Sequence, residues 1–267
     1  MPIIKLANNL PDINMVRTGP RGSAPVVLLH GVGLDLTFWD LQIAALCTTH
    51  DVIAFDMPGH GLSGKLRHPP SFGEMAAILA GVLAHAETGP AHLVGISAGG
   101  MIAQTFALQR PDLVRSLTLV ATLCTFSEAV RAILRERARV SRAAGMSVIA
   151  PLALERWFPA AFRARRPDLM DRATKSLLQQ DAEFHASMWD MIASLDLEAR
   201  LPSLSCPTMV VAGAEDINAP PAAARQLAGL IPGAELHEFA GAGHFPPIEM
   251  PDACNELIFG FLQRQTV

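Results

Sequence analysis

The pentapeptide Gly95-Ile96-Ser97-Ala98-Gly99 spells G-x-S-x-G and is the part of the chain best suited to chemistry. The apolar residues 91–94 before it suit a buried strand, and residues 100–110 after it have apolar side chains at helical spacing. A serine on a tight turn between strand and helix adopts a strained backbone, which requires small neighbours. Its hydroxyl then stands clear of the sheet, beside unpaired N–H groups of the helix N-terminus. The motif therefore predicts a nucleophilic serine.

A serine hydroxyl is a poor nucleophile until a base removes its proton and a third group orients that base. Two later loops present such side chains where predicted strands end. Glu215 and Asp216 follow the strand predicted over 208–212, and His244 lies in a glycine-rich turn after the strand predicted over 235–239. Because ligands of parallel sheets bind at the carboxyl ends of the strands, we expect His244 and one acid to lie beside the serine.

Apolar segments alternate along the chain with segments of helical periodicity, which is typical of a parallel sheet covered on both faces. The predicted fold class is α/β, with a mostly parallel sheet flanked by helices. Strands are predicted at 13–16, 24–30, 51–55, 91–94, 117–120, 208–212 and 235–239, and helices at 35–46, 72–85, 100–110, 221–231 and 251–264.

The pattern changes after the strand predicted at 117–120. From residue 127 to about residue 200 the sequence shows helical periodicity and no convincing strand. Ser127 and Asp181 are suited to cap helices, and Pro151 and Pro167 to occupy a first helical turn. We expect a helical cap inserted after the sixth strand or so. The expected domains are a core of residues 1–124 and 201–267 and a cap of residues 125–200.

Composition excludes several classes of protein. A chain of 267 residues with 50% hydrophobic and 17% charged residues can bury a large core and is not disordered. Its net charge of −4 gives no electrostatic reason to expect a nucleic-acid partner. The longest uncharged apolar stretch, residues 75–84, is too short to span a bilayer, and the N-terminus lacks a signal sequence. Four widely spaced cysteines suit buried thiols, so we expect a cytoplasmic protein without a membrane partner.

Histidine and glycine spacing argue against bound metals and cofactors. The nine histidines show neither H-x-H nor H-E-x-x-H spacing, and the glycines match no dinucleotide or phosphate-binding fingerprint. We therefore expect no metal and no cofactor. The sequence leaves open whether the protein is a monomer or a homodimer.

The order and spacing of its motifs make the chain similar to the α/β-hydrolase fold superfamily over nearly its whole length. This resemblance implies that Ser97 is the nucleophile, His244 the general base and then acid, and Asp216, rather than Glu215, the orienting carboxylate. Five motifs carry it: His30-Gly31-Val32-Gly33; Asp56, Gly59, Gly61 and Ser63; the elbow at 95–99; the acid loop at 213–220; and the histidine loop at 243–247.

The same resemblance implies an oxyanion hole. In that family the backbone N–H groups of the residues at Val32 and Ala98 would hold the oxyanion, each being worth roughly 3 kcal/mol in the transition state. It also makes His30 a brace for the oxyanion loop rather than a catalytic group.

Within the superfamily the chain is most similar to the 3-oxoadipate enol-lactonases and their relatives. The similarity lies in residues 33–40, in Glu155-Arg156-Trp157-Phe158 with Phe162-Arg163, and in residues 196–198 and 206–208. It implies hydrolysis of a small carboxylic ester or lactone through an acyl-enzyme, with cap arginines reaching a substrate carboxylate. The candidate substrate contacts are Trp39, Arg156, Trp157, Arg163 and Phe245.

Two departures from that subgroup keep other substrates open. Ala98 stands where those lactonases more usually have Met, and the oxyanion loop reads His-Gly-Val-Gly rather than a Ser-Asn type. A carboxylesterase of short acyl esters is the first alternative. A carbon–carbon bond hydrolase of a dienone acid is the second, although such enzymes usually have Trp, not Phe245, after the histidine. A ligand-binding receptor of the same fold is the non-enzymatic alternative, against which the complete set of Ser97, Asp216 and His244 argues.

Overall fold

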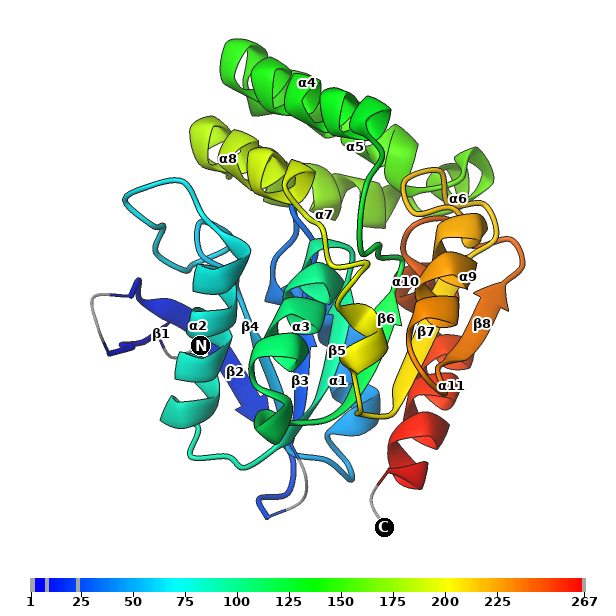
Figure 1. Cartoon of the computed structure of the whole chain (residues 1–267). Coiled ribbons are helices and arrows are strands. Elements are labelled where there is room, and N and C mark those ends of the chain that lie inside the picture. The colour runs from blue at the N-terminus through cyan, green and yellow to red at the C-terminus, as the bar shows by residue number, and fades with distance from the viewer. Residues whose placement is uncertain (1–2, 8–9, 23–24, 266–267) are drawn as a thin grey trace.

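The computed structural model describes residues 3–7, 10–22 and 25–265, and these form an eight-stranded sheet with helices on both faces (Figure 1). The strand order is β1-β2-β4-β3-β5-β6-β7-β8. β1 and β2 pair antiparallel, as do β2 and β4, and all other neighbours pair parallel. The strands are β1 (Ile3–Ile4), β2 (Ile13–Thr18), β3 (Val26–Leu29), β4 (Val52–Phe55), β5 (Ala91–Ile96), β6 (Val114–Val120), β7 (Thr208–Gly213) and β8 (Glu235–Phe239).

Successive side chains of the inner strands pack on opposite faces of the sheet, as the pleat requires. In β3, Val27 and Leu29 join one hydrophobic cluster, while Val26 and Leu28 join the other. Both faces are therefore buried, which is why these strands read as unbroken apolar runs in the sequence. α2 (Phe72–His85), α3 (Ala98–Gln109) and α9 (Pro221–Leu230) cover the first face, and α1 (Asp40–Leu46) and α11 (Pro251–Arg264) cover the second.

Five helices, which together we call the cap, lie in the chain between β6 and β7. This insertion after the sixth strand agrees with the predicted fold class. α4 and α8 pack side by side along the top of the molecule in Figure 1. Ser127 and Asp181 accept hydrogen bonds from Val130 N–H and Phe184 N–H, so both act as the predicted caps. The five helices are α4 (Glu128–Ala144), α5 (Met146–Trp157), α6 (Ala160–Arg165), α7 (Pro167–Leu178) and α8 (Ala182–Ala193).

Two helix predictions need correction. Pro151 lies inside α5 rather than in its first turn, because Gly145, with φ of +73°, already ends α4 and begins α5. The single helix expected at 35–46 is instead a 3-10 turn, η1 (Leu36–Trp39), followed by α1. Asp35 starts this turn by accepting a hydrogen bond from Thr37 N–H at 3.0 Å.

Short elements were missed because they contain too few residues to show a period. They are β1, α10 (Pro246–Glu249), η2 (Pro111–Leu113) and η3 (Leu201–Ser203). The four cysteines are unpaired thiols. Within the described residues, every helix is too short or too polar to cross a lipid bilayer.

Candidate active site

Ser97 occupies the sharp turn between β5 and α3, with φ of +53° and ψ of −120°. Left-handed φ is costly for a residue with a Cβ, so surrounding contacts must hold it. Ser97 N–H donates to the carbonyl of Val120 at 2.9 Å, and the Ser97 carbonyl accepts the Thr122 hydroxyl at 2.7 Å. The end of β6 and the segment that directly follows it thus hold the strained residue on both sides.

The flanking glycines have the packing role that the motif predicted. A Cβ on Gly99 would lie 2.2 Å from the carbonyl oxygen of Leu29. A Cβ on Gly95 would lie 2.6 Å from the carbonyl oxygen of Gly99. Both distances are far below van der Waals contact with rigid backbone, so the elbow closes only with glycine at these two positions.

His244 and Asp216 form a buried pair at the carboxyl ends of β7 and β8. The His244 Nδ1 lies 2.7 Å from Asp216 Oδ2, and the two side chains are 5% and 0% exposed. The other carboxylate oxygen of Asp216 accepts Asn218 N–H at 2.7 Å and Ala219 N–H at 3.0 Å. Because an ionised carboxylate only accepts, the proton of the imidazole faces Asp216 and leaves Nε2 as the basic nitrogen. Glu215, the rival acid, is exposed to solvent.

The loop carrying His244 is held by a residue that sequence reasoning missed. Glu249, on α10, accepts Gly243 N–H and Phe245 N–H, each at 2.8 Å. Burial raises the pKa of Glu249 above its ordinary value, although these two hydrogen bonds oppose the shift. His244 N–H itself donates to the carbonyl of Trp157 at 3.0 Å, so the end of α5 in the cap is fastened to the histidine loop. The only sequence signal for the role of Glu249 was its position as an acid in the first turn after the Pro246-Pro247 pair.

The predicted oxyanion loop lies against the elbow. A Cβ built on Gly31 would lie 3.2 Å from the Cβ of Ser97, and Ala98 is the first residue of α3. His30 Nε2 accepts Met57 N–H at 2.9 Å, so its Nδ1 must carry the proton and donate to the Gly31 carbonyl at 2.8 Å. Burial lowers the pKa of His30, which keeps the ring neutral. His30 therefore braces this loop, as predicted.

A small cavity, which we call the Ser97 cavity, connects these groups. Its volume is about 40 Å³, and Ser97, His244 and Val32 lie in its wall. That space holds a few water molecules and is smaller than an ester substrate. Trp157 and Phe245, two of the predicted substrate contacts, also line it. The remaining lining residues are Gly31, Met101, Leu123, Phe126, Leu134, Arg137, Trp189, Ile192 and Asn218.

Comparison with known proteins identifies the family of the chain. A model of the alpha/beta hydrolase fold family matches residues 24–251. The chain belongs to the α/β hydrolase fold family.

Individual relatives cover the chain almost end to end. This α/β hydrolase is 28% identical to 3-oxoadipate enol-lactonase 2 of Acinetobacter baylyi over 99% of both chains. In structure it is similar to the enol-lactonase of Burkholderia xenovorans LB400, with a TM-score of 0.93, 28% identity, and coverage of 98% of this chain and 100% of that one. A thermophilic esterase of Thermogutta terrifontis with bound malate gives a TM-score of 0.93 and 29% identity over 100% of both chains.

Three of the predicted substrate contacts do not line the Ser97 cavity. Trp39 is 0% exposed and packs edge-to-face on Phe38 at 4.9 Å between ring centroids, because the 3-10 turn η1 directs it into the core. Arg163 is half-buried on α6, which packs against α7 rather than over Ser97. Arg156 also does not line the cavity, although its backbone carbonyl accepts a hydrogen bond from the side-chain N–H of Asn218, a lining residue, at 2.7 Å.

The arginine that does line the Ser97 cavity is Arg137, which sequence reasoning missed. It lies on α4 with its guanidinium 5.1 Å from the ring centroid of Trp189, a cation–π contact. No described acid forms an ion pair with it. Burial, and then the neighbouring charge of Arg156, lower the pKa of Arg137 to about 10. On a helix rich in solvated arginines, no sequence pattern distinguishes the one that faces inward.

Proposed function

We propose that this protein is a serine hydrolase that cleaves a small carboxylic ester or lactone through an acyl-enzyme. The observation that carries the proposal is the buried Asp216–His244 pair, 2.7 Å from N to O, in which His244 lines the same cavity as the strained Ser97. These are the nucleophile, base and orienting acid that acyl transfer needs. The 3-oxoadipate enol-lactonase relatives support the ester or lactone class of substrate.

The reaction proceeds in two halves. The Ser97 hydroxyl attacks the substrate carbonyl while His244 Nε2 takes its proton, and the new carbon–oxygen bond makes a tetrahedral oxyanion. The N–H groups of Val32 and Ala98 hold that oxyanion. His244 then gives its proton to the departing alkoxide or enolate. Water, deprotonated by the same imidazole, attacks the acyl-enzyme and releases the carboxylic acid and Ser97. With a lactone, the leaving oxygen stays tethered to the acyl chain throughout, so nothing departs until water has released the whole product from Ser97.

We further propose that the substrate carries a carboxylate, which Arg137 binds. A half-buried guanidinium beside a second one is unfavourable without an anion, because both charges have lost water. Burial also lowers the pKa of Arg156, whose Nε is buried without a partner among the described residues. A carboxylate next to Arg137 would offset both costs and accept charge-assisted hydrogen bonds. The malate in the Thermogutta terrifontis esterase supports a preference for such acids.

The cap domain, which we place at residues 125–200, is proposed to set the size of the substrate. The closed Ser97 cavity of about 40 Å³ is too small for a substituted lactone. Cap side chains such as Leu134 and Trp189 must therefore move before a substrate can reach Ser97, and exchange of the cap would change selectivity while the core still cleaves esters.

Two measurements test the proposed function. A fluorophosphonate probe should label wild-type protein at Ser97 and leave a Ser97→Ala variant unlabelled. Folded protein that fails to label would favour a ligand-binding receptor instead. A panel should then compare a five-membered enol lactone bearing a carboxymethyl group, neutral and carboxylate-bearing esters of equal chain length, and a dienone acid. Faster cleavage of neutral esters would favour a short-chain carboxylesterase, and turnover of the dienone acid alone a carbon–carbon bond hydrolase.

A further inference from the structure

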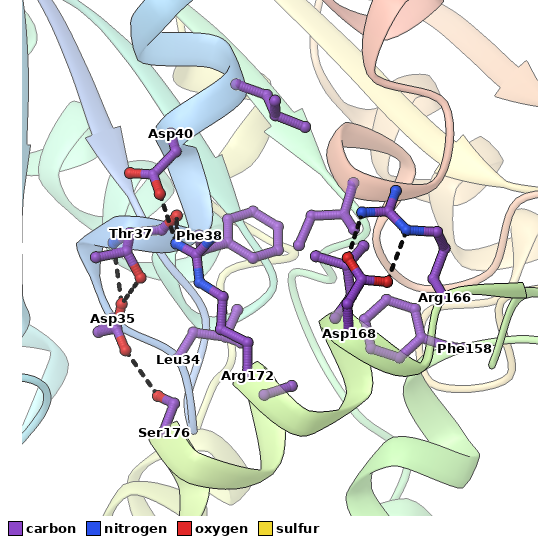
Figure 2. Close-up of a pocket in the computed structure, with 14 residues that line it drawn as sticks. Leu34, Asp35, Thr37, Phe38, Asp40, Phe158, Arg166, Asp168, Arg172 and Ser176 are labelled. Carbon is purple, nitrogen blue, oxygen red and sulfur yellow. Dashed lines mark hydrogen bonds and ion pairs between the residues drawn. The ribbon is translucent and has the colours of Figure 1, made fainter.

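A second, larger cavity shares no lining residue with the Ser97 cavity, and Figure 2 shows the side chains that line it. We call it the outer cavity. It is bounded by the segment from Leu34 to Leu41 on the core and by α7 of the cap. Its volume is about 310 Å³, near the lower end of the range for small-molecule sites and well above the 40 Å³ of the Ser97 cavity. Nothing in the proposed mechanism uses this space.

The charged groups around the outer cavity are already paired or hydrogen-bonded. Arg166 pairs with Asp168 through two hydrogen bonds of 3.0 and 2.7 Å, and Arg172 pairs with Asp40 at 2.6 Å. Figure 2 shows these two ion pairs on different sides of the cavity. Asp35 accepts the Ser176 hydroxyl at 2.8 Å. Among the described residues, no lining arginine is left without a carboxylate, so these groups have little to offer an anion.

The remaining wall is apolar. Its apolar lining residues are Leu34, Phe38, Leu41, Phe158, Leu169, Ala173 and Ile248. Transfer of apolar surface from water to such a wall is favourable by about 25 cal/mol per Å². The outer cavity therefore selects an uncharged and largely apolar molecule, in contrast to the carboxylate that Arg137 favours in the Ser97 cavity.

A layer of aromatic rings separates the two cavities. The rings of Phe38 and Phe158 lie 5.1 and 5.3 Å, between centroids, from that of Phe245. Phe245 lines the Ser97 cavity on its other side, directly follows His244, and is 1% exposed. Because this layer is closed and tightly packed, a molecule in the outer cavity cannot at the same time contact the serine.

We propose that the outer cavity is a second binding site, for an uncharged aromatic molecule of one or two fused rings. It is occupied independently of the Ser97 cavity. The apolar wall supplies the affinity. The arginines at the rim already have carboxylate partners, and Asp35 already accepts hydrogen bonds from Thr37 and Ser176, so a neutral ligand suits the cavity better than an anion.

Titration calorimetry with indole as the probe tests the proposal on the full chain. We expect saturable binding with one equivalent. Ala173 lines the outer cavity from α7, so Ala173→Trp should fill it and weaken indole binding at least tenfold. Lys175 lies on the same helix but is exposed and outside the cavity, so Lys175→Trp is the matched control and should bind within twofold of wild type. Equal binding by both variants would overturn the proposal.

Two further readouts remain valid if Ala173→Trp fails to fold. Crystals of the wild-type protein soaked with 5-bromoindole should show anomalous bromine density between Phe38 and Phe158. Density only beside Ser97 would refute a second site. Blocking Ser97 with a fluorophosphonate should leave the indole affinity unchanged, and loss of binding would place indole in the Ser97 cavity. Neither calorimetry nor bromine density depends on turnover, so this site and the hydrolase proposal can fail separately.

Discussion

Replacing Asp216 by Asn should greatly lower kcat, because it changes the tautomer of His244. One oxygen of Asp216 accepts two backbone N–H groups, from Asn218 at 2.7 Å and Ala219 at 3.0 Å. In Asp216→Asn the amide oxygen must keep this place, because an NH₂ group there would face two donors. The NH₂ therefore points at His244 Nδ1, which has to become an acceptor. The ring proton moves to Nε2, and that nitrogen can no longer take a proton from Ser97.

The expected loss follows from this wrong tautomer. Replacing the orienting Asp of a serine triad by Asn lowers kcat by about 10⁴-fold. At 1.36 kcal/mol per factor of ten, this loss equals about 5 kcal/mol of transition-state stabilisation. Substrate binding should change little, because Asp216 is buried and its side chain is 0% exposed. Stopped-flow hydrolysis of an activated ester gives kcat and KM, and the rate of fluorophosphonate labelling measures the first half-reaction alone.

Glu215→Gln is the matched control, since it removes the same charge one residue away from an exposed position. It should keep kcat within twofold of wild type. Thermal unfolding of both variants shows whether the fold survives. A drop of less than tenfold in Asp216→Asn, with the fold intact, would refute the role assigned to Asp216 and with it the proposed geometry of acyl transfer.

Three further predictions concern the cap, the buried histidines and the elbow. Arg137→Met should lower kcat/KM for a carboxylate-bearing ester roughly 10- to 100-fold, the worth of a lost charge-assisted hydrogen bond of about 1.5 to 3 kcal/mol, while a neutral ester of equal length reacts as before. Burial lowers the pKa of His92 to about 4, so the unfolded chain binds its proton first. The His92 contribution to the free energy of unfolding is then fully present above about pH 6.5 and is lost as the pH falls toward 4, by up to about 1.4 kcal/mol per pH unit. In urea titrations between pH 7 and 4, the free energy of unfolding should therefore fall less steeply with decreasing pH in His92→Gln than in the wild type. Gly99→Ala should destabilise by about 3 kcal/mol or more in urea unfolding, since its Cβ would lie 2.2 Å from a backbone oxygen.

The first and third of these predictions have a control variant, and all three have a result that would contradict them. Arg135 lies on the same helix as Arg137 but is exposed, so Arg135→Met should leave both esters unaffected, and equal losses on both substrates in Arg137→Met would contradict a carboxylate contact. For His92, an unchanged pH slope would show that the ring does not titrate on unfolding. A Cβ on Gly89 would meet no atom of the described residues within 4 Å, so Gly89→Ala should be nearly neutral, and equal stability of the two alanine variants would argue against the tight elbow.

The sequence by itself predicted the fold class and the order of the central elements. Strands buried on both faces appear as unbroken apolar runs, and the helices between them show apolar residues with a period of 3.6. Both patterns can be recognised within a short stretch of sequence. The elbow was readable from its local motif, and Gly95 is required by a contact within the motif itself, whereas the contact that requires Gly99 comes from Leu29 at the end of β3. Short elements such as α10, and the start of α5 at Gly145 rather than Pro151, escaped because a single turn has no period.

Only the tertiary structure decided which side chains face the serine. The family resemblance already favoured Asp216 over the adjacent Glu215, and the structure adds the reason, because the packing of that loop against His244 buries Asp216 and exposes Glu215. Long-range packing likewise places Arg137 in the wall of the Ser97 cavity and buries Trp39 in the core, away from that cavity. The direction of a side chain depends on what packs against its element from far away in the chain, and a pattern of neighbouring residues does not contain that information.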